Sequence, residues 1–269
     1  MADLSTAEFE ERIRMARAFS ESTARSLATV PNKGIALMTL AQQQATIACL
    51  SIQRGRRDDA RKAFARASGY LLDLTATSPT TAPCGSRKSA IEFALLSGDV
   101  ELESRCLETG LPESCADLGR FVEPYLRALH ALALKNQEAA RRSAVQLSQV
   151  SVEEAQKVKY YPYLGDVVSA ILEKSEPALC VALGKQLERH IHYSKKGHLR
   201  GSEAGLVCTP AAALAVLASR FGLRPVVEER SRKVELKFRV SALETWEGKP
   251  TKGLFFETPV DVLPLEFLG

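Results

Sequence analysis

The sequence has few aromatic residues and no long apolar run. Aromatic side chains make up 6% of the 269 residues, with a single tryptophan. The longest uninterrupted apolar run, residues 210–218, is far shorter than the roughly 18 residues that a membrane-spanning helix needs. No apolar segment of the signal-peptide kind follows the first residues, 1–8, which carry two acids. We therefore expect a cytoplasmic protein that does not bind a membrane.

The sequence also lacks the short motifs of common catalytic sites, namely HExxH, GxSxG, the P-loop and GxGxxG. His190 and His192 are two residues apart, so on a helix they point about 200° away from each other and cannot bind one metal ion from one face. We expect these two histidines and His198 to be solvated or to contact a partner. The sequence predicts no enzyme, no cofactor and no metal.

The six cysteines are irregularly spaced. They form no CxxC or CxxH pair, so their spacing supports neither a zinc site nor a redox dithiol. Most lie in apolar, helix-like segments, where cysteine behaves as a small hydrophobic residue. We expect buried, reduced thiols. The six are Cys49, Cys84, Cys106, Cys115, Cys180 and Cys208.

The net charge is small. The chain has 36 Lys and Arg residues against 32 Asp and Glu residues, which gives +4. Nucleic-acid-binding proteins usually have a larger basic excess. Two basic clusters, at residues 54–67 and 195–200, are the only features that favour such a role. We expect no nucleic-acid partner.

The acidic residues gather in one segment. Residues 97–124 contain seven acidic and two basic residues, a net charge of −5. Solvated helix faces usually explain such runs, although a local acidic surface also complements a basic protein partner. We predict that this segment binds a partner. The predicted partner-binding residues are Asp99, Glu101, Glu103, Glu108, Glu113 and Asp117.

The first 222 residues have helical periodicity. Apolar residues recur at spacings of three and four, and glycine and proline mostly separate such stretches. Four similar turns, at residues 55, 98, 136 and 174, are 43, 38 and 38 residues apart, a period typical of helical-hairpin repeats. The sequence predicts an all-α, repeat-like array of helical hairpins over 1–222, either an α-solenoid or an irregular bundle. The clearest loop is residues 75–85.

The remaining residues, 223–269, have a different pattern. Residues 233–240 alternate charged and apolar side chains, which favours a β-strand. Residues 246–250 resemble a turn and 253–257 a second strand, and prolines follow. We expect a small C-terminal β-hairpin and extended tail that packs on the helices.

Three segments carry a resemblance to a known family. Residues Gly197–Ala218, Phe221–Gly222 and Asp261–Pro264 are similar to the C-terminal part of the immunity protein 49 family, mostly helical proteins that neutralise toxins of bacterial polymorphic-toxin systems. The resemblance implies a binding protein without catalytic residues, whose partner is a cognate secreted toxin acting in the cytoplasm. We expect a monomer or small oligomer. The alternative is a helical-repeat scaffold or chaperone that holds a secreted protein or peptide in a groove.

Overall fold

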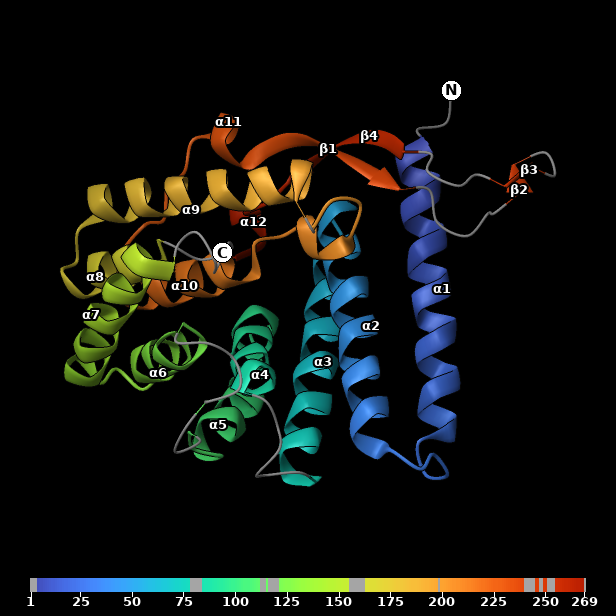
Figure 1. Ribbon diagram of the computed structural model, residues 1–269, viewed down its shortest axis with the longest axis horizontal. Helices are drawn as coiled ribbons and strands as arrows, with labels where there is room; N and C mark the ends of the chain where they lie inside the picture. The colour runs from blue at the N-terminus through green and yellow to red at the C-terminus, as the bar shows by residue number, and fades with distance from the viewer. Residues whose placement is uncertain are drawn as a thin grey trace.

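The computed structural model shows a helical protein with a small β-ribbon near its C-terminus (Figure 1). The predicted all-α class with a C-terminal β-hairpin is therefore confirmed. The structure describes residues 4–77, 84–111, 115, 121–154, 163–197, 199–239, 245–246, 249–250 and 255–268.

The helices follow one another with short connections. In chain order they are α1 (Leu4–Ser26), α2 (Lys33–Gln53), α3 (Arg57–Thr77), α4 (Cys84–Ser97), α5 (Val100–Glu108), α6 (Val122–Ala133), α7 (Gln137–Glu154), α8 (Leu164–Leu172), α9 (Glu176–Lys196), the 3-10 helix η2 (Glu203–Gly205) and α10 (Thr209–Arg220). The C-terminal part contains α11 (Glu229–Arg232), β1 (Lys233–Arg239), β2 (Thr245–Trp246), β3 (Lys249–Pro250), β4 (Phe255–Asp261) and α12 (Leu265–Leu268).

Helix α10 is largely buried and packs against several other helices of the fold. Neighbouring helices pack in sequence from α1 to α4 and from α6 to α9, and α10 contacts α4, α6, α8 and α9. Residues 210–215 of α10 are all buried, as expected for a helix that is apolar on every side. Helices α4, α6, α8 and α9 are thus packed on one buried helix, as in an irregular bundle, whereas α1, α2 and α3 extend to one side of it (Figure 1).

The predicted turns share one backbone geometry. Gly55, Gly98, Lys135 and Lys174 all have positive φ angles, between 52° and 73°. After three of these turns the amide of the next residue bonds to the carbonyl five residues before it, at 2.8–3.0 Å, which is the Schellman helix end. The turns at 55, 98 and 174 are confirmed. The remaining one is centred on Lys135, one residue before the predicted position.

At three of these four turns the residue after the positive-φ position caps the next helix. The side chains of Asp99, Asn136 and Ser175 each accept a hydrogen bond from the amide three residues later, at 2.9–3.3 Å. These N-caps satisfy amides that a helix start leaves without partners. A helix end and the next helix start therefore occupy only a few residues. This explains the regular spacing of the hairpins.

The predicted loop at residues 75–85 is wrong at both ends. Helix α3 continues through Thr77 and α4 begins at Cys84; residues 78–83 lie outside the described part. The Thr75 hydroxyl donates to the Leu71 carbonyl at 2.9 Å, so a threonine that suggested a turn satisfies its hydroxyl within the helix.

The C-terminal ribbon pairs β1 with β4 in antiparallel register, from Lys233 opposite Asp261 to Arg239 opposite Phe255. The second strand extends beyond the predicted 253–257, through Pro259, because a two-stranded ribbon tolerates proline at an open edge. Within the predicted 246–250 turn, Trp246 of β2 pairs with Lys249 of β3. Leu236 and Val260 of the ribbon belong to the same apolar core as the helices.

Two cysteines depart from the prediction of six reduced thiols. Cys84 and Cys115 form a disulfide with a Cα–Cα distance of 5.7 Å, which is within the range that such a bond needs. Their separation of 31 residues gave no sequence signal. Burial raises the pKa of Cys106 to about 11. It raises the pKa of Cys49 and Cys208 to about 12, so these thiols are expected to be unreactive.

Thiol counting tests this distribution. The native protein is expected to react with a thiol reagent at pH 8 at one position only, the half-buried Cys180. In denaturant without reductant, four of the six cysteines are expected to react, because two are held in the disulfide. Addition of a reductant should raise the count to six. Six reactive thiols before reduction would show that the disulfide does not form.

Two segments of the described chain are long and apolar enough to cross a membrane, residues 33–53 and 203–220. In each case most of the apolar window, 61% and 67% respectively, is buried inside the protein. This is weak evidence for a membrane span, because core helices have the same composition.

Candidate functional site

Helix α5 presents part of the predicted acidic surface. Glu101 and Glu108 are exposed on it, and the exposed Asp99 caps its N-terminus by accepting a 2.9 Å hydrogen bond from the Leu102 amide. The Glu108 carboxylate accepts a hydrogen bond from the Ser104 hydroxyl at 3.1 Å. The exposed Arg105 lies between the two glutamates on the same face. We refer to Asp99, Glu101 and Glu108, whose net charge with Arg105 is −2, as the α5 acidic face.

Glu103 belongs to the interior instead. Its buried carboxylate accepts two hydrogen bonds, of 2.5 and 2.7 Å, from the guanidinium of Arg220 at the end of α10. This bidentate pair raises the pKa of Arg220 and joins α5 to α10. Glu103 is therefore left out of the candidate partner surface. Glu113 and Asp117 lie outside the described residues.

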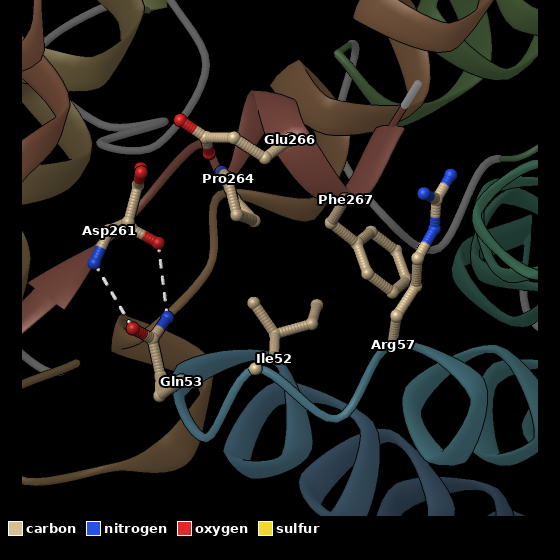
Figure 2. Close-up of a pocket in the computed structure, with 8 residues that line it drawn as sticks. Ile52, Gln53, Arg57, Asp261, Pro264, Glu266 and Phe267 are labelled. Atoms are coloured by element: carbon tan, nitrogen blue, oxygen red, sulfur yellow. Dashed lines mark hydrogen bonds between the residues drawn. The ribbon is translucent and has the colours of Figure 1, made fainter.

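A cavity of about 350 Å³ lies between the α2–α3 turn and the C-terminal tail (Figure 2). The sequence did not predict it, since its two walls, residues 52–57 and 261–267, are far apart in the chain. The lining residues are Ile52, Gln53, Gly55, Arg57, Asp261, Pro264, Glu266 and Phe267.

Gln53 fixes one wall of this cavity. Its Oε1 accepts a hydrogen bond from the Asp261 amide at 3.1 Å, and its Nε2 donates to the Asp261 carbonyl at 3.0 Å (Figure 2). The same Nε2 donates to the Leu206 carbonyl at 3.1 Å. One side chain at the end of α2 thus joins the tail to the segment before α10.

A buried arginine fixes the opposite side of the tail. Arg232 pairs with the Asp261 carboxylate and, at 2.7 Å, with Glu266, and the second Asp261 oxygen accepts from the Leu263 amide at 3.0 Å. Burial raises the pKa of Asp261, whereas the hydrogen bond from Arg232 lowers the pKa of Glu266. The Asp261–Pro264 element, one basis of the family resemblance, therefore docks the tail.

Arg57 is the cavity residue with a free charge. Its side chain is exposed, and within the described part of the chain it forms no hydrogen bond or ion pair. Figure 2 shows it beside Phe267, across the cavity from Asp261. Four residues further along α3, the Arg61 guanidinium lies 5.9 Å from the centre of the Phe267 ring.

The prediction of solvated histidines is wrong for His190. This side chain is buried, and its Nε2 lies 3.0 Å from the Gly205 carbonyl, so we assign the proton to Nε2. A Cβ at Gly205 would lie 3.0 Å from the Leu199 carbonyl, which explains why glycine occupies this position. His192 is exposed and contacts the Tyr193 ring edge-on. His198 lies outside the described residues.

His190 gives the fold a pH dependence. Burial lowers its pKa from 6.5 to about 4, so the unfolded chain binds a proton here more readily than the folded chain. The stabilisation is complete above pH 6.5 and is lost as the pH falls towards 4, by about 3 kcal/mol. His190→Gln should flatten the fall in unfolding free energy between pH 7 and 4, measured by urea titration. An equal fall in His190→Gln and the exposed-site control His192→Gln would contradict this origin.

Comparisons with protein-family models, curated proteins and solved structures found no match. The resemblance to immunity proteins therefore rests on the three segments described above. Among the described residues, no group of three or more His, Cys, Asp or Glu side chains is placed to hold a metal ion.

Proposed function

We propose that this protein is an immunity protein that binds a cognate secreted toxin and blocks it without catalysis. The main support is the α5 acidic face, which is exposed on a helix whose inner side is bonded to α10 through Glu103 and Arg220. Toxins that act on nucleic acids or other polyanions carry basic clefts, and an opposing acidic surface speeds association and favours the correct partner.

Two contacts fix the helix that carries the α5 acidic face. Glu103 anchors the inner side of α5 to Arg220, and the Arg87 guanidinium donates to the Gly110 carbonyl at 2.8 Å just beyond the helix end. Val100, next to Asp99, is 75% exposed and offers an apolar contact beside the charges. A rigid surface loses little conformational entropy on binding.

The alternative function, a helical-repeat scaffold or chaperone, is less well supported. Such proteins hold their ligands in an open inner groove. Here α10 packs against α4, α6, α8 and α9 and lies in the space that a groove among these helices would need. An inhibitor that uses an outer face fits this arrangement better.

The compartment is a separate proposal. The sequence predicts the cytoplasm, where thiols are kept reduced, whereas the Cys84–Cys115 bond is of a kind that oxidising compartments favour. We retain the cytoplasm as the proposal and expect the bond to be open there. A thiol count on protein alkylated in denaturant at the moment the cells are lysed, so that buried thiols also react, tests it: six modified cysteines are expected, and four would place the protein in an oxidising compartment.

Charge reversal tests the binding surface. The double variant Glu101→Lys and Glu108→Lys is expected to slow association with the toxin by about tenfold at low salt. The loss should shrink at high salt, where exposed charges are screened. Stopped-flow or surface plasmon resonance gives the rate, and any secreted protein encoded beside this gene is the first candidate toxin to test.

The matched control reverses two exposed acids elsewhere, Glu21→Lys on α1 and Glu188→Lys on α9. It changes the net charge equally, so its association rate should stay near that of the unmodified protein. Equal slowing in both double variants would mean that overall charge, rather than the α5 acidic face, governs binding.

A further inference from the structure

The cavity between the α2–α3 turn and the tail has the features of a small ligand site. Its volume of about 350 Å³ is within the usual range for small-molecule pockets, about 300–1,000 Å³. Ile52, Pro264 and Phe267 give it an apolar lining, so the part of a ligand that enters the cavity must be apolar or aromatic.

Most polar groups of the lining are already bonded. Both carboxylates, of Asp261 and Glu266, are paired with Arg232, and the amide of Gln53 is bonded to backbone groups. These groups are poorly placed to recognise a cation or a neutral polar ligand, because a new bond would require breaking an existing one.

Arg57 is different, because it lines the cavity and its guanidinium is bonded to nothing in the described part of the chain. Figure 2 shows the guanidinium beyond the Phe267 ring, at the rim of the cavity rather than inside it. Arg61 lies on the same side of α3, one turn on, against the Phe267 ring. Two guanidinium groups on this side outweigh the single net negative charge of the Arg232, Asp261 and Glu266 cluster. A guanidinium fork binds a carboxylate through two parallel hydrogen bonds.

We propose that this cavity binds a carboxylate joined to an apolar group, and that Arg57 recognises the carboxylate while Phe267 and Ile52 contact the apolar part. Such a carboxylate is found in small aromatic acids and at the end of a peptide with an apolar last residue. The site is distinct from the α5 acidic face, so the two proposals stand or fall separately.

Two probes, titrated into the full-length protein by calorimetry, test this site and separate the two sources. The first is 3-phenylpropionate. The second is an acetylated tetrapeptide, Gly-Gly-Gly-Phe, with a free carboxyl end; its C-terminal amide serves as the uncharged control. We expect at least one of the two acids to bind, and the amide to bind at least about tenfold more weakly than its acid. Tighter binding of the peptide would identify a chain end as the source, and tighter binding of phenylpropionate a small acid.

Variants locate the site. Arg57→Gln should weaken binding of the acids by about tenfold. Lys62→Gln, which removes the same charge from an exposed position on the same helix, should leave affinity nearly unchanged. Chemical-shift changes in the unmodified protein should fall on Gly55, Arg57 and Phe267, which makes the test independent of any variant's folding. Absence of binding at millimolar concentrations, equal binding of acid and amide, or shifts elsewhere would each overturn the proposal.

Discussion

Replacement of Arg232 by methionine is expected to lower the free energy of unfolding by about 3–5 kcal/mol, because it leaves a buried charge without its partner. Arg232 is buried and holds the carboxylates of Asp261 and Glu266. Asp261 is itself largely buried, so its unpaired carboxylate must either be protonated or pull the tail away from the helices. Urea unfolding gives the free energy, and amide exchange of β4 and α12 should rise with it.

The matched control is Arg230→Met in the same short helix. Arg230 is 84% exposed and pairs with Glu228 on the surface, so its loss should change stability by at most about 1 kcal/mol. The double variant Arg232→Met with Asp261→Asn should recover part of the loss, since it removes the unpaired charge. Similar stability of the two single variants would show that Arg232 does not hold the tail.

Reversal of Glu103 is expected to destabilise the protein about as strongly, by at least 3 kcal/mol. A lysine at this position would bury a positive charge against Arg220, in place of the bidentate pair. The same reversal at the exposed Glu101, two residues earlier, should change stability by about 0.5 kcal/mol or less. Thermal unfolding of the two variants makes the comparison.

A charge swap completes this test. Glu103→Lys combined with Arg220→Glu restores opposite charges at the two positions and should recover a measurable part of the stability. If Glu103→Lys is as stable as Glu101→Lys, Glu103 lies on the surface and belongs with the α5 acidic face. The swap therefore also checks which acids of this segment are free to bind a partner.

Local chemistry made the helical array predictable. Gly55 and Gly98 follow apolar helix segments and tolerate the positive φ with which these helices end. Lys135 and Lys174 adopt the same conformation without that advantage, and only the regular spacing of the turns indicated them. The alternation of charged and apolar residues at 233–240 predicted β1, because successive side chains of a strand point to opposite faces of the sheet.

The candidate sites depend on contacts that local patterns do not contain. Glu103 and Arg220 are 117 residues apart, and Gln53 and Asp261 are 208 apart, so neither pair leaves a trace in sequence spacing. The acidic cluster therefore indicated the general position of the candidate surface but could not separate the buried Glu103 from the exposed Glu101. His190 was misjudged for the same reason, since its partner Gly205 lies in a different element.

Titration of the toxin's activity with this protein tests the central proposal most directly. An inhibitor that acts by binding should abolish activity at a fixed molar ratio, with the loss of activity linear up to that ratio and the toxin recovered chemically unchanged. Mass spectrometry of the toxin and size-exclusion chromatography of the complex complete the measurement. Inhibition by substoichiometric amounts, or covalent modification of the toxin, would contradict the account and identify the protein as an enzyme.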